Sequence, residues 1–451
     1  MSGFNMTLAE AATALGVDYH GADCHLTGIS TDSRKIQPGE LFIALRGPNF
    51  DGHQFIEKAI VNGAVAVVAE HETQFAVPAL CVKDSRLALG QLASAWRQRF
   101  DIPLIAVTGS NGKTTVKELL TSIFSQQGQP LSTQGNFNNE IGMPLTLLRL
   151  TARHTAAIIE MGANHPGEIE YLSNLACPTV ALVNNAGDAH LEGFGSIEGV
   201  AEAKGEIYSG LRNDGVAVIN IDDPYSYIWQ ELCEGKEIIS FGLEQDVDVT
   251  AKYSATPMGM KLNLTTNDES GEVLLPLLGR HNVMNALAAT AAATAAGVSL
   301  EVILAGLQNA QAAPGRLELK SGLGGSRIID DTYNANPASL NAGIAVLTAY
   351  PGRHYLALGD MGELGEAAPQ LHYQAGVEAK RRGVERLYAV GELSQQACAG
   401  FAAGAQWFER QEEMIAALRQ ELQAEVTLLV KGSRRMHMER VVEAVATGTE
   451  D

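Results

Sequence analysis

The chain has 451 residues, of which 46% are hydrophobic and 19% charged, and its formal net charge is −20. This length exceeds that of one ordinary domain, and the composition is typical of a soluble globular protein with two or three domains. An acidic chain has no general electrostatic reason to bind nucleic acid or an anionic membrane, so anionic ligands must be bound by local donors.

The chain begins with a zone of short apolar runs that extends to about residue 84. The runs lie at residues 41–45, 64–68 and 79–82, and turn-forming residues such as Pro38-Gly39 and Pro48-Asn49 separate them. We expect a small mixed α/β domain over residues 1–84.

The second zone starts with a helical pattern at residues 87–100. Apolar runs then alternate with helical patterns, as in parallel strands buried on both faces. Between residues 246 and 278 apolar and polar residues alternate, which indicates a few antiparallel strands, and an alanine-rich helix over 283–296 ends at Gly297. We therefore expect a central domain with a mostly parallel sheet over residues 85–315. Its predicted parallel strands lie at residues 104–107, 156–159, 180–183 and 216–219.

Beyond a hinge expected at Pro314-Gly315, strand and helix patterns alternate again. A polar or glycine-containing turn follows each predicted strand, and ligands of open α/β sheets bind at such carboxyl ends. We expect a Rossmann-like C-terminal domain over residues 316–451, so the predicted fold class is α/β with three domains. The strands of this last domain are predicted at residues 327–329, 355–358, 387–390 and 426–430.

A glycine-rich loop lies between the apolar run at residues 104–107 and a helix predicted over 114–126. Its glycines let backbone amides converge on phosphate oxygens at the helix N-terminus. Lys113 can reach the β- and γ-phosphates of ATP, and the Thr114 hydroxyl can bind Mg²⁺. The two glycines are closer together than in the standard phosphate loop. The prediction therefore depends on the strand–loop–helix context around them. The alternative is an ordinary glycine-rich turn with a surface lysine. The loop residues are Gly109, Ser110, Asn111, Gly112, Lys113, Thr114 and Thr115.

Candidate metal ligands follow the next two apolar runs. Glu160 comes directly after residues 156–159, and His190 follows Asn184-Asn185, which end the run at 180–183. Mg²⁺ in nucleotide sites takes one or two carboxylates besides phosphates and water. The alternative for Glu160 is a helix cap or a solvated residue.

Lys204 lies in an apolar stripe of a helix predicted over residues 196–211, together with residues such as Val200 and Ile207. Such a lysine either extends to solvent or stays buried as a neutral amine with a lowered pKa. A neutral amine can take up CO₂ as a carbamate, which would turn Lys204 into an oxygen ligand. The sequence leaves both readings open.

Together these segments resemble the Mur ligase family, in the family's order and over nearly the whole chain. The strongest stretch, residues 330–337 (Asp-Asp-Thr-Tyr-Asn-Ala-Asn-Pro), is similar to the member that adds D-alanyl-D-alanine to UDP-N-acetylmuramoyl-tripeptide. The Asp-Asn-Pro-Arg motif of the member that adds a diamino acid is absent. The matching segments are residues 31–34, 108–115, 138–142, 160–164, 203–207, 281–286, 314–316, 330–337 and 431–434.

The resemblance implies an ATP-dependent amide ligase of peptidoglycan precursor synthesis that works through an acyl phosphate. It implies two Mg²⁺ ions, one held by Thr114 and Glu160 and the other by His190 and a carbamylated Lys204. Catalytic roles are implied for Lys113, Lys204, His190 and Arg316. Beyond the loop, ATP is implied to contact Asn285 at the adenine, Arg316 at the phosphates and Asp331 at the ribose.

Substrate contacts are implied in all three domains. The first would bind the UDP-sugar and the last the dipeptide, with closure expected at joints near residue 85 and Pro314-Gly315. The candidate substrate residues are Ser30, Thr31, Ser33, Asp51, Gly52, His53, Asn138, Asn139, Tyr333, Asn334 and Asn336.

Two competing interpretations share part of this pattern. Folate polyglutamylating and cyanophycin-type ligases have the same phosphate loop, but residues 333–336 argue against them. The other interpretation is a regulatory nucleotide-binding module without ligase activity. The set of Lys113, Glu160, His190 and Lys204 argues against it, because nucleotide binding alone needs no second metal site.

The remaining sequence features concern the cellular location. The cysteines are isolated and odd in number, which argues against a disulfide framework or a structural zinc site. Residues 1–16 lack the pattern of a secretory signal, and no apolar run reaches the roughly 18 residues of a membrane span. We expect a cytoplasmic monomer. The cysteines are Cys24, Cys81, Cys177, Cys233 and Cys398.

Overall fold

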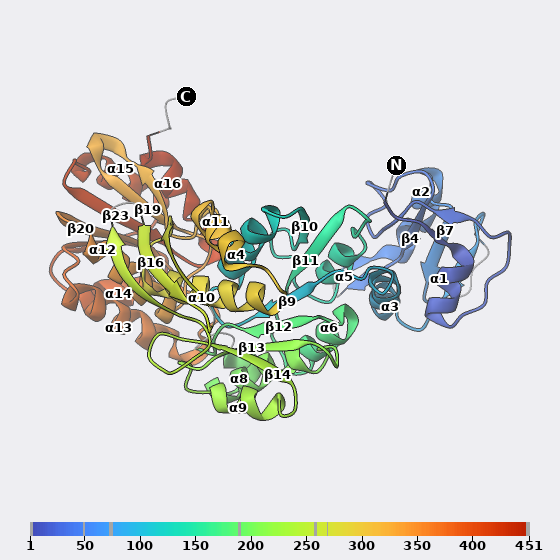
Figure 1. Ribbon diagram of the computed structural model, residues 1–451. Helices are drawn as coiled ribbons and strands as arrows, with labels where there is room; N and C mark the ends of the chain where they lie inside the picture. The colour runs from blue at the N-terminus through green and yellow to red at the C-terminus, as the bar shows by residue number, and fades with distance from the viewer. Residues whose placement is uncertain are drawn as a thin grey trace.

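The computed structural model describes residues 3–47, 50–71, 75–187, 191–256, 259–267 and 269–447. Three α/β units follow one another along the chain, and Figure 1 shows the first and the third on opposite sides of the second. Each unit is built on its own largely parallel sheet. The α/β class was predicted for all three units, and a mostly parallel sheet for the second. Within the described ranges, no helix combines the length and apolarity needed to cross a membrane.

The first unit contains a four-stranded parallel sheet in the order β3-β4-β7-β8. The apolar runs predicted as strands form β4, β7 and β8. Helix α1 (Leu8–Leu15) begins at a capping box made by Thr7 and Glu10 and ends at Gly16, whose φ of 65° is the left-handed conformation that glycine tolerates. The other elements are β1 (Met6–Thr7), β2 (His25–Leu26), β3 (Gly28–Ser30), β4 (Glu40–Ile43), β5 (Arg46–Gly47), β6 (Phe50–Asp51), η1 (Gly52–Phe55), α2 (Ile56–Val61), β7 (Ala66–Ala69) and β8 (Ala79–Cys81).

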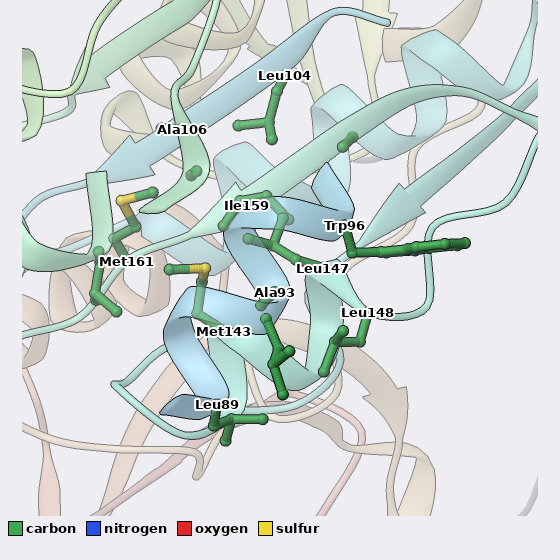
Figure 2. Packing of buried hydrophobic residues seen from close by; sticks show 14 of the residues in the cluster. Leu89, Ala93, Trp96, Leu104, Ala106, Met143, Leu147, Leu148, Ile159 and Met161 are labelled. Atoms are coloured by element: carbon green, nitrogen blue, oxygen red, sulfur yellow. The ribbon is translucent and has the colours of Figure 1, made fainter. Parts of the chain in front are cut away.

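Helix α3 (Ser85–Arg97) joins the first unit to the second. Asp84 caps its first turn by accepting hydrogen bonds from the amides of Arg86 and Leu87. The helix packs against α1 on one side and α5 (Gly142–Leu147) on the other. Figure 2 shows Leu89, Ala93 and Trp96 of α3 in the cluster that also holds Met143 and Leu147 of α5. The two units therefore share one continuous apolar core.

The central unit contains a six-stranded sheet in the order β10-β11-β9-β12-β13-β14, in which all neighbours are parallel. Four of these strands coincide with predicted ones. The edge strands β10 and β14 were not predicted, because Pro130 and polar residues interrupt their apolar pattern. The strands are β9 (Leu104–Thr108), β10 (Gln129–Ser132), β11 (His154–Glu160), β12 (Val180–Val183), β13 (Val216–Asn220) and β14 (Glu237–Phe241).

Helices cover both faces of this sheet. One face packs against α4 and α10, with an antiparallel three-stranded sheet beside them, as the alternating pattern indicated. The other face packs against α3, α5, α6 and the helices after β12. The helix predicted over residues 196–211 is shorter: α8 ends at Gly205 and continues as a short 3₁₀ turn. The elements are α4 (Lys113–Ser125), α6 (Glu168–Ala176), α7 (Leu191–Phe194), α8 (Ile197–Gly205), η2 (Glu206–Tyr208), α9 (Ser226–Leu232), β15 (Thr250–Thr256), β16 (Gly259–Thr265), β17 (Ser270–Leu275), α10 (Arg280–Ala295) and α11 (Leu300–Gln308).

The third unit has a six-stranded sheet in the order β18-β19-β23-β20-β21-β22, parallel except for the edge strand β18. Helices α12, α13 and α14 cover one face, and α15 and α16 cover the other. This is the Rossmann-like arrangement expected from the sequence. The elements are β18 (Glu318–Ser321), η3 (Leu323–Gly325), β19 (Arg327–Asp331), α12 (Pro337–Ala349), β20 (Arg353–Gly359), η4 (Gly365–Ala367), α13 (Ala368–Arg381), β21 (Arg386–Val390), α14 (Ser394–Phe401), β22 (Ala405–Phe408), α15 (Gln411–Glu421), β23 (Val426–Lys431), η5 (Arg434–Met436) and α16 (Glu439–Val445).

Candidate active site

The glycine-rich loop connects β9, in the middle of the central sheet, to the N-terminus of α4. Gly109 has a φ of 148° and Gly112 a φ of 81°, both in the region that side chains disfavour. A Cβ on Gly112 would lie 2.3 Å from Asn285 Oδ1 and 2.5 Å from Asn184 Nδ2, so the space under the loop is full. The strand–loop–helix context predicted for a phosphate site is therefore present. The remaining loop residues, Ser110, Asn111, Thr114 and Thr115, are partly buried at the start of α4 or just before it.

Asparagines after β12 hold this loop in shape. The amide of Asn111 donates to Asn185 Oδ1 at 2.9 Å, and the side chains of Asn184 and Asn185 both donate to the Asn111 carbonyl. Asn184 also donates to Asn285 Oδ1 at 2.9 Å, and Asn285 donates to Asn282. Asn285 thus lies buried beneath the loop as a support, while its implied adenine contact stays a prediction.

Lys113 folds back over the loop that it follows. Its Nζ donates to the Gly109 carbonyl at 2.7 Å. Burial lowers the pKa of Lys113, the Glu160 carboxylate opposes this effect, and the Arg316 guanidinium adds to it. Lys113, Glu160 and Arg316 are therefore close enough to act on one another, as a shared phosphate site requires.

Glu160 ends β11 beside the loop, and its side chain is only 3% exposed. Oε1 accepts a hydrogen bond of 2.7 Å from Asn138 Nδ2, whereas Oε2 is buried without a hydrogen-bond donor among the described residues. A buried carboxylate oxygen without a partner is costly, and a bound cation would remove that cost. The site therefore fits a divalent metal at Glu160. Within the described ranges no cluster of three or more histidine, cysteine or acidic side chains offers another such site.

Lys204 is 1% exposed in α8, with its Nζ 5.5 Å from the centre of the Phe194 ring. Burial and the positive charge of Lys113 together lower the pKa of Lys204 to about 7. The buried alternative of the sequence analysis thus holds, rather than the solvent-exposed one. His190, the expected partner of Lys204 at the second metal, lies outside the described residues.

The third unit reaches the loop through two side chains. Arg316 Nη2 donates to Thr114 Oγ1 at 3.3 Å, and its guanidinium lies 4.2 Å from the centre of the Tyr333 ring. Arg316 Nε is buried without an acceptor among the described residues, which suits an anionic ligand. Asn336 caps α12 and its Nδ2 donates to Asn111 Oδ1 at 3.0 Å. Arg316 was expected at the ATP phosphates and Asn336 at the substrate. Both side chains lie beside the phosphate loop, and their contacts with ligands stay predictions.

Asp331 and Lys431 form a buried ion pair at the carboxyl ends of β19 and β23. Lys431 Nζ lies 2.5 Å from Asp331 Oδ2 and donates to the Asn334 carbonyl at 2.9 Å. One carboxylate oxygen of Asp331 is therefore already engaged by Lys431. Burial lowers the pKa of nearby His281 to about 4, with Asp331 opposing and Lys431 adding to this shift.

Asn138 and Asn139 lie in the loop after β10. Asn138 bonds to Glu160, as described, and Asn139 Oδ1 accepts from the Gly142 amide at 2.9 Å at the start of α5. Lys117, which was not predicted from the sequence, is buried on α4 and donates to the Thr133 carbonyl at 3.0 Å, at the base of this loop. Its position four residues after Lys113 is the signal that could have identified it.

The candidate residues of the first unit form their described hydrogen bonds with residues of that same unit. The imidazole of His53 bonds to Asp51 Oδ1 at 2.7 Å and accepts from the Glu70 amide at 3.0 Å, so both ring nitrogens are used. Gly52 is buried, and a Cβ there would lie 2.7 Å from the Leu45 carbonyl oxygen. This turn therefore has a structural role in the unit. Ser30, Thr31 and Ser33 lie at the end of β3 or in the turn that follows it.

A cavity of about 470 Å³ opens between the central and third units. Asn136, from the loop that carries Asn138, forms part of one wall, and residues of the third unit such as Tyr333 and Arg434 form the others. Because Tyr333 also contacts Arg316, the cavity is adjacent to the phosphate loop.

Comparison with known proteins agrees with this geometry. Three family models match successive parts of the chain: "Mur ligase family, catalytic domain" residues 25–97, "Mur ligase middle domain" residues 107–293, and "Mur ligase, glutamate ligase domain" residues 315–434. A relative from Escherichia coli (strain K12), named UDP-N-acetylmuramoyl-tripeptide–D-alanyl-D-alanine ligase, is 43% identical over 445 residues, which cover 98% of each chain.

Solved structures give the same result over nearly the full length. A crystal structure of MurF from Acinetobacter baumannii superposes with a TM-score of 0.93 at 37% identity, covering 98% of this chain and 99% of that one. MurF ligase from Thermotoga maritima in complex with ADP superposes with a TM-score of 0.85 at 29% identity, covering 92% and 96%. The chain therefore belongs to the Mur ligase family.

Proposed function

We propose that this protein is an ATP-dependent ligase that joins D-alanyl-D-alanine to UDP-N-acetylmuramoyl-tripeptide, a step of peptidoglycan precursor synthesis. The convergence of Lys113, Glu160 and Arg316 at one phosphate loop supports the ATP-dependent chemistry. The full-length similarity to the E. coli relative of that name is the observation that carries the choice of substrates. The same similarity favours this reaction over folate polyglutamylation or cyanophycin synthesis, and over a regulatory module without ligase activity.

The chemistry begins with the carboxylate of the tripeptide, which is a poor electrophile. A carboxylate oxygen attacks the γ-phosphorus of ATP, the bond from that phosphorus to ADP breaks, and an acyl phosphate results. Lys113 and Arg316 stabilise the charge that spreads over the transferring phosphoryl oxygens. The amine of the dipeptide then attacks the acyl carbon, the bond to phosphate breaks, and the amine loses a proton as the amide forms.

Two Mg²⁺ ions are part of the proposal. Thr114 and Glu160 would hold one, and Lys204 with His190 the other; the ions supply charge stabilisation at the phosphates. Lys204 would serve as a carbamate, formed when its neutral amine binds CO₂ and releases a proton. The burial of Lys204 beside Phe194 supports this modification, because a charged amine is disfavoured there.

The substrates are proposed to meet between three domains, with boundaries at residues 1–84, 85–315 and 316–451. The first would bind the UDP-sugar through the turn at Ser30, Thr31 and Ser33. The third would bind the dipeptide near Tyr333, Asn334 and Asn336, with Asp331 at the ribose of ATP. We also propose a cytoplasmic location, which the five free thiols support, and a monomer, which light scattering would test.

The function is tested by phosphate release from ATP, with the UDP-tripeptide and D-alanyl-D-alanine each added or withheld. We expect sustained release only when both substrates are present, together with a product that contains both. Phosphate release at the same rate with and without the dipeptide would refute the assigned reaction. Repeating the assay with excess EDTA and then with added Mg²⁺ tests the metal requirement.

The carbamate is tested by replacing Lys204 with alanine and adding short carboxylic acids. We expect activity to fall by about 10²-fold or more, as for loss of a metal ligand, and to recover partly with the acids. Lys431→Ala is the control, since it removes another buried lysine and the acids should not rescue it. Full activity of Lys204→Ala without any addition would rule the role out.

A further inference from the structure

We propose that Arg434 recognises the free C-terminal carboxylate of the incoming dipeptide, which the proposed function places near Tyr333, in the cavity between Tyr333 and α16. The inference rests on the proposed ligase function and adds a residue that selects the second substrate. At about 470 Å³ the cavity lies within the size range of small-ligand sites.

The position of the cavity places its occupant next to the phosphoryl-transfer groups. On one side, Asn136 belongs to the same loop as Asn138, which bonds to Glu160 at 2.7 Å. On the other side, Tyr333 lies against Arg316, which in turn contacts Thr114. An amine held in the cavity is therefore adjacent to the place where the acyl phosphate forms.

The charges around the cavity argue against a nucleotide in it. Its lining contains two cationic side chains, Lys320 and Arg434, and three acidic ones, Asp330, Glu439 and Glu443. A di- or triphosphate would meet a wall with net negative charge, whereas the groups of opposite sign match a small zwitterion. An unmodified dipeptide carries one ammonium and one carboxylate, so its charges can be matched at the two ends.

Of the two cations, Arg434 is the better placed for a ligand carboxylate. Lys320 Nζ is already shared by Asp330 at 2.9 Å and Glu318 at 3.1 Å. Arg434 pairs through Nη1 with Glu439 at 3.2 Å, but its side chain is 60% exposed. A guanidinium has five donors in a planar fork, so it can bind a carboxylate while keeping one existing partner. Exposed Glu443 is suited to the ammonium end.

The test compares D-alanyl-D-alanine with its C-terminal carboxamide in the native protein and in Arg434→Gln. We expect the native protein to prefer the free acid in kcat/KM by about tenfold or more, as for a lost charge-assisted pair. Arg434→Gln should lose that preference by losing activity toward the acid alone, with the KM values for ATP and UDP-tripeptide unchanged within about twofold. A variant that keeps the full preference for the acid would overturn the proposal.

Controls separate this outcome from other failures. Arg440→Gln removes an exposed arginine of α16 that does not line the described cavity, and its preference should match that of the native protein. If Arg434→Gln does not fold, Arg434→Lys carries the same test, because lysine cannot form the bidentate pair and should reduce the preference. Native protein that releases no phosphate in response to the dipeptide would refute the ligase function itself. Native protein that is active but does not distinguish acid from amide would refute only the role of Arg434.

Discussion

At the scale of single residues, the site holds its charged groups in pairs that cross between elements. Lys431 lies against Asp331, and both act on His281 at the start of α10 in the central unit. Charged groups of the third unit therefore shift the pKa of His281, although His281 belongs to the central unit.

His281 makes the stability of the protein depend on pH. Its pKa is lowered from 6.5 to about 4 by burial in the folded chain, so below pH 6.5 the unfolded chain binds a proton that the folded chain does not. The stabilisation is present above pH 6.5 and is lost as the pH falls toward 4. Urea unfolding at pH 7.5 and 5.0 should show a smaller loss for His281→Gln than for the native protein. The exposed His165→Gln should behave like the native protein, and an unchanged pH dependence in His281→Gln would contradict the assignment.

At the scale of elements, the phosphate loop depends on the fit between its glycines and the asparagines beneath them. A Cβ on Gly112 would overlap Asn285 Oδ1 and Asn184 Nδ2, and its φ of 81° is strained for alanine. We expect Gly112→Ala to weaken ATP binding and to lower kcat/KM by about 10²-fold, because a displaced loop loses its donors. Gly235→Ala is the matched control: Gly235 has the same φ of 81°, but a Cβ there would meet no atom within 4 Å. Equal effects of both changes in a nucleotide-binding titration would show that steric overlap under the loop is unimportant.

Buried strands could be predicted from the sequence because their apolar residues are continuous. The run at residues 180–183 coincides with β12, and that at 104–107 lacks only Thr108 of β9. Edge strands could not be predicted, because one side of β10 is open and its residues are partly polar. The predicted helix over 196–211 was too long because a 3₁₀ turn keeps the same apolar face as α8, so periodicity does not show where α8 ends.

The sequence predicts a site residue only where its type and its position next to a strand or loop together indicate its chemistry. Lys113, Thr114 and Glu160 follow strands in a way that points to phosphate and metal. The supporting roles of Asn184 and Lys117 depend on bonds to residues far away in the chain, at Asn285 and Thr133. A local sequence pattern does not show which distant residues form hydrogen bonds with each other. It likewise cannot show a cavity whose walls come from two units.

At the scale of the whole molecule, two described side-chain hydrogen bonds join the third unit to the phosphate loop: Arg316 to Thr114 and Asn336 to Asn111. They connect the phosphate loop to the unit that follows Gly315, whose φ is 68°. Domain closure that excludes water is a common requirement when reactive intermediates form.

Asn336→Ser tests this contact without removing the helix cap. Serine still caps α12 but cannot donate to Asn111 Oδ1. We expect kcat to fall by about three- to tenfold with thermal stability nearly unchanged, because one hydrogen bond between units is worth about 1 kcal/mol. Asn111→Ala should have a similar effect, and the double variant should be no worse than either single one. Additive effects in this double-mutant cycle would show that the two side chains act separately.

The core shared through α3 also has a consequence for the order in which the chain matures during synthesis. Phe4 packs on Trp96, the Trp96 indole donates to the Leu150 carbonyl at 3.1 Å, and Arg99 donates to the Asn5 carbonyl. During synthesis, Phe4 and Asn5 can therefore make these contacts only after α3 and Arg99 have been made, and Trp96 completes its own contacts only once Leu150 has been added. The apolar core of the first unit therefore stays incompletely packed until the segment that contains Leu147 and Leu150 has been synthesised.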